Sequence, residues 1–441
     1  MKAVKKIKSA LNKSIKSVCK SKNKYCVNPE KDFSRNSKLP IDKVIKTVLG
    51  FSSKSLNNEM IDIFVGDKSL APVSALVQQR SKLLTSAFED IFKTFTKSMN
   101  PIKLFNGYRL LAVDGSDIRT PPNPNDPDSY YKQKNCKPYS LYHLNALYDL
   151  RSHTYLDAIV QKRRNWNEHR ALCDMVDRYD CTIPSIFIAD RGYESYNNLA
   201  HIQQKGQFFL FRIKDIKSYG ILHGFDLPDE DEFDISISLN LTNKQSKITK
   251  LLCKDRNRFR FIPSTSTFDF FPDKSNYLDP PCFFELFFRL VRLEVIPGKY
   301  EVLITNLPID LFDSNTLKYL YSLRWGIETS FRTLKYTIGL LYFHSKKPKY
   351  IIQEIFAKLT MYNFTELIAA SISFHKALRK YIYSINFSVA ANVCRKFFLG
   401  FCTPDFVEAV IQKHILPIRS LKNKSRLLQR KPAVSFIYRV A

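Results

Sequence analysis

The chain has 441 residues, is 44% hydrophobic and carries a formal net charge of +28 at pH 7. The length and apolar content exclude wholesale disorder and predict two or three domains, while the charge favours a polyanionic partner such as nucleic acid. The nine cysteines are scattered without a CxxC pair, and no apolar run reaches the ~18 residues of a membrane span, so a soluble cytoplasmic protein is expected.

The first 24 residues predict a basic amphipathic helix. They contain nine lysines and no acidic residue, and their apolar residues recur at helical spacing: Val4, Ile7, Leu11, Ile15 and Val18. Such a helix suits a membrane surface, a transit segment or a DNA-contacting arm, and we favour the arm.

Residues 41–99 show helical periodicity. Within them, Ser55–Phe64, a glycine-containing turn and Pro72–Leu84 are compatible with a helix-turn-helix. An ordinary helical bundle explains the pattern equally well, because the motif is weak at the level of sequence.

From Tyr108 the periodicity changes to that of strands. Predicted strands cover Arg109–Val113, Tyr142–Tyr148, Tyr155–Gln161, Ser185–Ala189 and Gln207–Ile213. Helices are expected at Glu168–Tyr179 and Ser195–Lys205, which gives a mixed α/β sheet. The remaining segments are a β-rich insertion at 218–298, a resumed strand at Glu301–Thr305, an apolar helix at Ile351–Phe374 and a cationic tail at Lys413–Ala441.

Two aspartates follow predicted strands directly. Asp114 begins Asp-Gly-Ser, and Asp190 begins Asp-Arg-Gly-Tyr. An aspartate placed just past an apolar strand and before a glycine turn is held at the sheet edge with its carboxylate facing outward. Each motif alone is usually only a turn, so the prediction depends on their combination with a third carboxylate.

That third carboxylate is predicted on an amphipathic helix at residues 321–335. At about 100° per residue, one arc of roughly 60° holds Tyr321, Arg324, Glu328 and Lys335. Three carboxylates form an oxygen-rich cage for hard cations such as Mg²⁺. Two such ions ~4 Å apart can activate water or a sugar hydroxyl and stabilise the leaving oxygen of a phosphodiester.

These motifs resemble those of a known family. Leu-Ala-Val-Asp114-Gly-Ser, Ile-Ala-Asp190-Arg-Gly-Tyr and Tyr321-x2-Arg324-x3-Glu328-x6-Lys335 look like the DDE triad and YREK signature of bacterial insertion-sequence transposases. They are most similar to insertion-sequence family four, the relatives of the Tn-five transposase. The resemblance covers about residues 35–365.

The resemblance implies an α/β fold with an RNase H-like catalytic core interrupted by a β-rich insertion. It implies an N-terminal helical DNA-binding domain and a basic helical C-terminus. The expected divisions are 1–100 for the basic arm and helical domain, 101–217 and 299–365 for the two parts of the core, 218–298 for the insertion and 366–441 for the C-terminal region.

The resemblance also implies how the site acts. Asp114, Asp190 and Glu328 would hold two Mg²⁺ ions, for which Mn²⁺ can substitute, and DNA phosphates would be contacted by Tyr321, Arg324 and Lys335. The implied function is cut-and-paste transposition by a homodimer on paired terminal inverted repeats, in the bacterial cytoplasm at the nucleoid. The alternatives are an inactive DNA-binding relic acting as a repressor, and a metal-dependent nuclease that never joins strands.

Several neighbouring residues carry weaker hypotheses. Arg191 touches DNA or pairs with a carboxylate; Asp117 is expected to cap a turn rather than bind metal; Glu168 suits the start of a helix. Trp325 is expected in the core. Family members stack a flipped base on a Trp in the insertion, which this chain lacks, leaving as candidates Phe268, Phe270 and Phe271.

Overall fold

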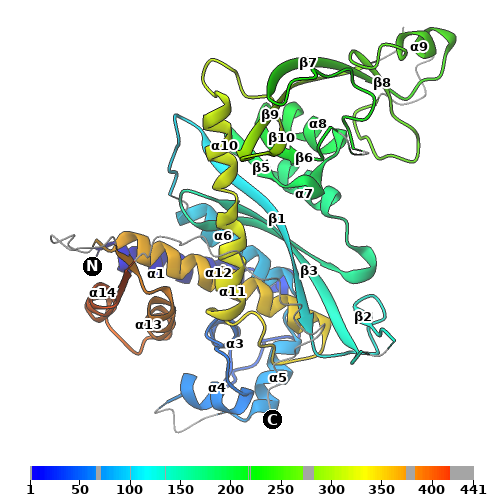
Figure 1. Ribbon diagram of the computed structural model, residues 1–441. Coiled ribbons are helices and arrows are strands. Elements are labelled where there is room, and N and C mark those ends of the chain that lie inside the picture. The colour runs from blue at the N-terminus through cyan, green and yellow to red at the C-terminus, as the bar shows by residue number, and fades with distance from the viewer. Residues whose placement is uncertain are drawn as a thin grey trace.

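The computed structural model describes residues 2–65, 71–99, 101–134, 136–216, 218, 220–271, 283–373 and 383–417. Within these ranges, no helix is both long and apolar enough to cross a membrane. A helical layer and a large mixed sheet make up the molecule (Figure 1).

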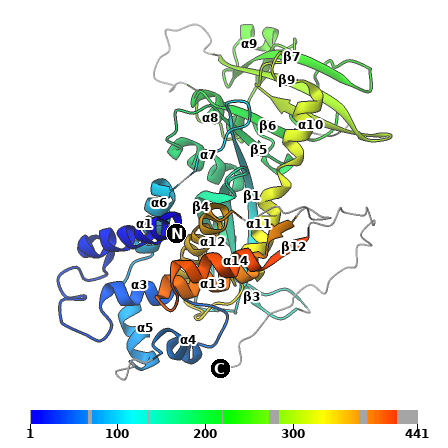
Figure 2. The ribbon, with the colours of Figure 1, turned by 90° about the vertical axis from the view of Figure 1, so that its left-hand side faces the viewer.

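The helical layer is built around one buried helix, α12 (Pro348–Ser371). Its buried residues occupy all sides, as expected for a helix enclosed by others. Figures 1 and 2 show its neighbours packed along it. They are α1 (Lys2–Lys20), α3 (Ile41–Leu49), α6 (Ser86–Met99) and α13 (Phe387–Leu399). Shorter helices complete the layer: α2 (Lys22–Tyr25), α4 (Leu56–Ile63), α5 (Val73–Ser81) and α14 (Pro404–Lys413).

The N-terminal helix is part of this layer. The five apolar residues predicted to share one face are all buried, and α1 packs on α6 and α12. The predicted helix is therefore confirmed, and its apolar face completes the core, while its role as a DNA-contacting arm stays a prediction. Its lysines, such as Lys5, Lys13 and Lys16, remain exposed.

The central sheet follows the order β2-β3-β1-β5-β6-β10-β9-β7-β8, with β4 paired to β3. Its strands are β1 (Arg109–Thr120), β2 (Tyr130–Tyr131), β3 (Tyr139–Asp149), β4 (Thr154–Lys162), β5 (Ser185–Ala189), β6 (Phe208–Ile213), β7 (Phe233–Thr242), β8 (Phe259–Phe261), β9 (Phe284–Ile296) and β10 (Lys299–Thr305). β3 is antiparallel to β1 and β4, whereas β1, β5 and β6 are parallel to one another. The mixed α/β sheet predicted from the sequence is thus confirmed.

Helices cover both faces of the sheet. Successive β1 residues point to opposite sides, so Leu110 and Ala112 join the core shared with α12 while Leu111 and Val113 join a second core. The second core contains α7 (Glu168–Arg178) and α8 (Tyr196–Gln204). The first face also carries α11 (Trp325–Tyr336), which follows α10 (Ser314–Ser322).

The segment 218–298 extends the same sheet. β9 pairs with β10 on one side and with β7 on the other, while α9 (Lys247–Leu252) lies at the far end (Figure 1). A separate two-stranded sheet pairs β11 (Tyr383–Ile385) with β12 (Ile415–Pro417).

The helix-turn-helix hypothesis is tested only in part. Its two helices are present as α4 and α5. Residues 66–70 of the intervening turn lie outside the described residues, as do residues 418–441 of the predicted cationic tail.

Candidate active site

Asp114 and Asp190 lie level with each other on neighbouring parallel strands. β1 and β5 are paired with Ala112 opposite Ile188, and the two aspartates follow two residues later on each chain. Asp190 directly follows β5, as predicted, and its carboxylate accepts a hydrogen bond from the Gly192 N–H at 2.8 Å. The parallel register therefore brings the two predicted carboxylates to the same end of adjacent strands.

Asp114 is not followed by a turn, so that part of the prediction is wrong. β1 continues to Thr120, with Asp114 opposite Ala146 of β3. Residues 115–120 have lost β5 as a neighbour, since that pairing ends at Ala112, but they still pair with β3. The long partner strand keeps the Asp-Gly-Ser segment extended.

Glu328 is carried by α11, which packs against β1. An added Cβ on Gly326 would lie 2.9 Å from the Leu150 side chain, so glycine permits the close approach of helix and sheet. The Ser330 Oγ lies 2.8 Å from the hydroxyl of Tyr155 in β4. These contacts set the position of the first turn of α11, which includes Glu328.

The predicted single helix at 321–335 is also wrong, because it consists of two helices. α10 ends at Ser322 and α11 begins at Trp325. Between them, the N–H of Arg324 donates to the carbonyl of Tyr321 at 3.0 Å, a bond three residues back instead of four. Tyr321 therefore belongs to α10, and Arg324 lies in the tight turn between the helices.

Arg324 joins two of the predicted carboxylates. Its Nη2 lies 2.7 Å from the Oε1 of Glu328, and its Nη1 lies 3.9 Å from the Oδ2 of Asp114. The Arg324 side chain is only 7% exposed. A buried guanidinium thus lies beside both acidic groups, at a residue for which the family resemblance implies a phosphate contact.

The Asp114 carboxyl has a strongly perturbed pKa. Burial raises it to about 7. The Gly115 N–H, 2.8 Å from Oδ1, and Arg324 lower the pKa, while the nearby charges of Asp190 and Glu328 raise it. Asp114 is therefore a desolvated acid whose ionised form lacks sufficient stabilisation, and such groups concentrate at functional sites.

The three carboxylates offer suitable ligands for a hard cation. Within the described part of the chain, no group of three or more His, Cys, Asp or Glu side chains is arranged to hold a metal as it stands. Glu328 instead engages Arg324. The donor set still fits Mg²⁺ chemically, because it consists of carboxylate oxygens and because a divalent cation would remove the charge cost at Asp114.

The other predicted DNA contacts surround this group. The Tyr321 ring is overlain by the guanidinium groups of Arg212 and Arg324, at 5.8 and 5.7 Å. Burial lowers the pKa of Lys335. The negative charges of Asp117 and Asp114 act in the opposite direction, and the positive charge of Arg119 lowers the pKa further. Arg191 is exposed in the 3₁₀ turn η2 (Arg191–Tyr193) after Asp190.

Sequence reasoning missed a histidine cluster on the opposite face of β1. His143 Nδ1 lies 2.9 Å from Asp117 and its Nε2 lies 2.8 Å from Glu168. Burial alone would lower the pKa of His143, but these carboxylates raise it to about 9. Asp117 is thus a strand residue paired with His143, not a turn cap. Glu168, at the start of α7, is paired with the same histidine. No sequence spacing indicates these contacts.

Gly115 makes room for this cluster. An added Cβ would lie 2.2 Å from the His143 ring and 2.6 Å from the Glu168 carboxylate. The glycine of the Asp114 motif therefore serves a close side-chain approach rather than a turn.

The aromatic candidates also differ from expectation. Trp325 is 61% exposed instead of buried, and Trp166, 42% exposed, lies with its ring centroid 4.6 Å from that of His143. The three insertion phenylalanines are half-buried and pack on one another and on neighbouring rings, with Phe268 and Phe271 at 4.4 Å. Phe270 also packs on His201 of α8, with ring centroids 4.7 Å apart, and a base-stacking role for the three rings stays a prediction.

The fold places one aspartate on β1, one aspartate directly after β5 and one glutamate on α11 at the same part of a mixed sheet. The chain belongs to the transposase DDE domain family, whose model matches residues 105–364. It is 23% identical over 344 residues to the transposase InsG for insertion sequence element IS4 of Escherichia coli strain K12, covering 75% of this chain and 70% of InsG. The predicted membership of the IS4 family of DDE transposases is confirmed.

A solved structure also aligns with the chain. It is the cryo-EM structure of the piggyBac transposase synaptic complex with hairpin DNA. The alignment covers 90% of this chain and 80% of that chain, with a TM-score of 0.40 and 10% identity.

Proposed function

We propose that this transposase cuts DNA at the ends of its own insertion sequence and joins the freed ends to a new site. The observation that carries the proposal is the half-buried Asp114 carboxyl beside Arg324, whose raised pKa reflects partial burial and the proximity of Asp190 and Glu328. A protein keeps such an unfavourable group where a ligand offsets its charge.

In this proposal Asp114, Asp190 and Glu328 hold two Mg²⁺ ions, and Mn²⁺ substitutes for them. When bound, the metal ions activate the attacking water or 3′-hydroxyl and stabilise the leaving oxygen. Arg324 supplies the positive charge beside Asp114 and Glu328 when no metal ion is bound. It must release Glu328 before all three carboxylates can bind metal. The freed guanidinium is then able to contact a phosphate.

The remaining predicted contacts orient the DNA. Tyr321, Lys335 and Arg191 lie around the carboxylates and are proposed to contact phosphates near the cleaved end. The strand order, with an antiparallel β1-β3-β4 unit followed by parallel β5 and β6, supports an RNase H-like core. We propose that a homodimer pairs two terminal inverted repeats, bound through the N-terminal helices.

Alanine variants of the three acidic residues test this function. Asp114→Ala, Asp190→Ala and Glu328→Ala should each retain binding to an oligonucleotide carrying the terminal repeat and lose its cleavage in Mg²⁺. A variant that still cuts at a substantial rate would remove that residue from the site. Wild-type protein that binds without cutting indicates a repressor, and cutting without strand transfer indicates a nuclease.

A further inference from the structure

A stacked array of arginines and tyrosines lies at the far end of the β1–β3 ribbon. The guanidinium carbon of Arg163, in the 3₁₀ turn η1 (Arg163–Asn165), lies 4.0 Å from the Tyr131 ring centroid. The rings of Tyr131 and Tyr139 meet edge to face at 5.3 Å, and the Arg119 guanidinium carbon lies 5.2 Å from the Tyr139 ring centroid. We call these four residues the Arg–Tyr array.

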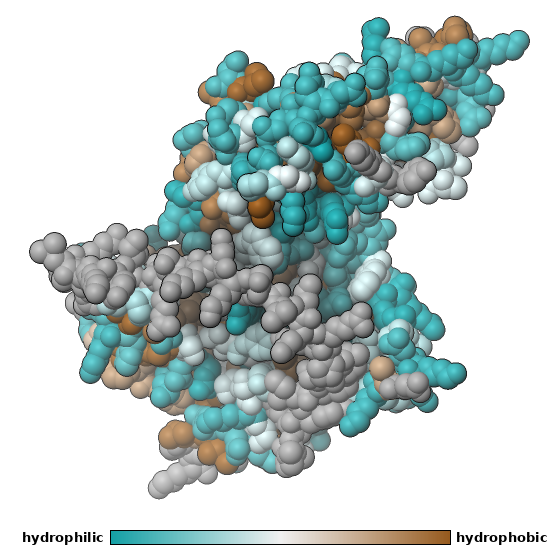
Figure 3. All heavy atoms as spheres, in the orientation of Figure 1, coloured by the Kyte–Doolittle hydropathy of each residue, from teal (hydrophilic) through white to brown (hydrophobic). Residues whose placement is uncertain are grey.

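Lysines add to the positive charge of this tip. Lys132, Lys134 and Lys137 are exposed and border an open hollow of about 660 Å³. Asp126 is buried, and Lys162 lies 2.7 Å from it, so its negative charge is locally neutralised. In Figure 3, which has the orientation of Figure 1, the surface over β2 and the adjoining end of β3 is mostly hydrophilic.

The array is connected to the candidate active site. The charges of Asp114 and Arg119 both act on the Lys335 ammonium, which α11 carries beside β1. Arg119 follows Asp114 by five residues along β1, so their backbone positions are roughly 17 Å apart at ~3.4 Å per residue, and the odd spacing places the two side chains on opposite faces of the strand. B-DNA rises 3.4 Å per base pair, so this span corresponds to about five base pairs.

We propose that the Arg–Tyr array and the three lysines bind the phosphate backbone of duplex DNA outside the element, about five base pairs from the cleaved phosphodiester. This inference rests on the proposed function. Arginines stacked on tyrosine rings lose less side-chain freedom on binding a phosphate, because the ring already restricts the guanidinium.

The choice of outside DNA follows from the chemistry of the tip. Lysine ammonium groups and stacked guanidinium groups bind phosphates without reading bases, so the contact does not depend on sequence. DNA outside the element differs at every insertion and must be held in this way. DNA inside the element carries the same repeat each time, and its bases can be read.

Binding of the full chain to three duplexes tests the proposal. One duplex carries the terminal repeat and stops at the cleavage site. The second adds about 15 base pairs of outside DNA, enough to pass the tip. The third adds the same length on the inner side. Fluorescence anisotropy in metal-free buffer at several salt concentrations gives the affinity and its salt dependence without cleavage.

The variant K132A/K134A/K137A should lose affinity only for the duplex with outside DNA. The slope of log affinity against log salt should flatten by about 0.9 for each lost phosphate contact. Arg163→Ala should act in the same direction. Tyr131→Leu, which keeps every charge, should weaken binding to that duplex by removing the ring under Arg163.

The matched control is K247A/K250A/K254A, which removes three exposed lysines at α9, at the other end of the sheet. An equal loss in this control, or an equal loss on all three duplexes, would overturn the proposal, as would a loss confined to the inner extension. Cleavage by the wild-type protein in Mg²⁺ is measured separately. Failure of the proposed function therefore remains distinguishable from failure of this contact.

Discussion

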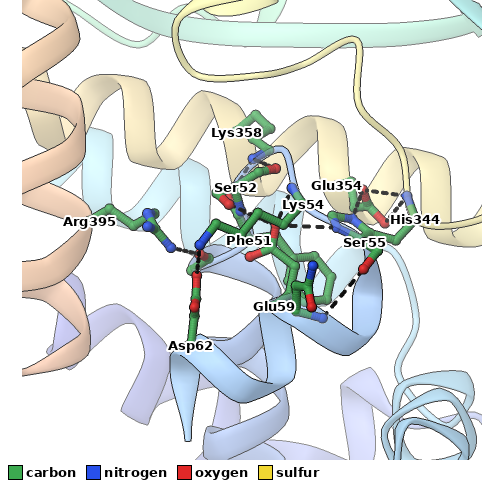
Figure 4. A network of polar contacts seen from close by, with 12 residues as sticks. Phe51, Ser52, Lys54, Ser55, Glu59, Asp62, His344, Glu354, Lys358 and Arg395 are labelled. Atoms are coloured by element: carbon green, nitrogen blue, oxygen red, sulfur yellow. Dashed lines mark hydrogen bonds and ion pairs between the residues drawn. The ribbon is translucent and has the colours of Figure 1, made fainter. Parts of the chain in front are cut away.

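Carboxylates in two regions of this protein have opposite pKa shifts. Glu59 and Glu354 lie in a polar network between the N-terminal helices and α12 (Figure 4), and both have a pKa lowered to about 2. Asp114, on the sheet, has a pKa raised to about 7. Burial acts on all three in the same direction, so the difference comes from their partners.

The network supplies each of its carboxylates with several donors. Burial alone would raise the pKa of Glu354, but Arg80 and His344 reverse the shift, with the Arg80 Nη1 at 2.9 Å and the His344 Nδ1 at 3.0 Å. Burial also opposes ionisation of Glu59, which accepts hydrogen bonds from the backbone N–H groups of Ser52 and Lys54, both at 2.9 Å. These bonds fix α4, α5 and the segment after α11 onto α12.

Asp114 has fewer stabilising partners and two acidic neighbours. The comparison separates a carboxylate that the fold uses for stability from one that remains poorly compensated. A carboxylate whose ionised form is poorly stabilised by the protein alone is expected where a cation binds and where catalysis takes place.

The largest effect is expected at Asp114. Asp114→Asn should lower cleavage by roughly 10³-fold or more, as for other residues central to catalysis. The variant should not lose stability, because an amide avoids the charge cost. Cleavage assays and urea unfolding in metal-free buffer measure both quantities.

The pH dependence of the same variant sharpens this prediction. The pKa of Asp114 is about 7 in the folded state, against an ordinary value of 3.8. The folded protein therefore holds the proton more tightly, so this group makes stability fall as pH rises from about 4 to 7. Asp114→Asn should lack this fall, and an unchanged pH profile would contradict the raised pKa.

Breaking the network should instead destabilise the fold. Arg80→Leu leaves Glu354 buried without its main partner and should cost about 3–5 kcal/mol in the free energy of unfolding. Replacing both residues by leucine should recover part of that loss. As a control, Lys46→Ala removes an exposed pair with Asp42 and should change stability by less than about 0.5 kcal/mol in urea unfolding.

Acid should affect the network in the opposite direction from Asp114. The pKa of Glu59 falls from 4.5 to about 2 on folding, so its contribution is present above pH 4.5 and is lost as pH decreases towards 2. Glu59→Gln should be less stable near neutral pH and lose less stability between pH 4.5 and 2. Thermal melts at several pH values measure both effects. An equal fall in Tm of variant and wild type between pH 4.5 and 2 would contradict this role.

Sequence periodicity predicted the elements that depend on local patterns. Ser185–Ala189 forms β5 with the predicted bounds, and Asp190 follows it directly. The Asp114-Gly115 motif predicts a turn, but its extended conformation depends on pairing with β3, whose residues lie about 30 positions later. No local pattern reports that partner.

The helix break and the burial of α1 have the same origin. Leu323 and Arg324 have helical backbone angles and interrupt the helix only through their hydrogen-bond pattern, while Gly326 fits closely against Leu150, which directly follows β3. The apolar stripe of α1 was visible in the sequence, but the helices that cover it were not. Tertiary contacts decided both features.

The smallest effect is expected at Ser330, behind the Glu328 turn of α11. Its hydroxyl donates to the Ile327 carbonyl at 2.7 Å, so the Tyr155 hydroxyl at 2.8 Å is the donor to Ser330 Oγ. Ser330→Ala removes that acceptor and should cost about 1 kcal/mol in the free energy of unfolding.

Cleavage by the same variant should fall only a few-fold, because the three carboxylates remain and only the contact of α11 with β4 is weakened. Thr333→Ala, at a half-buried position of the same helix where the hydroxyl donates to the Thr329 carbonyl, should change neither quantity. Inactivation of Ser330→Ala as complete as that of Asp114→Asn would show that Ser330 does more than seat α11.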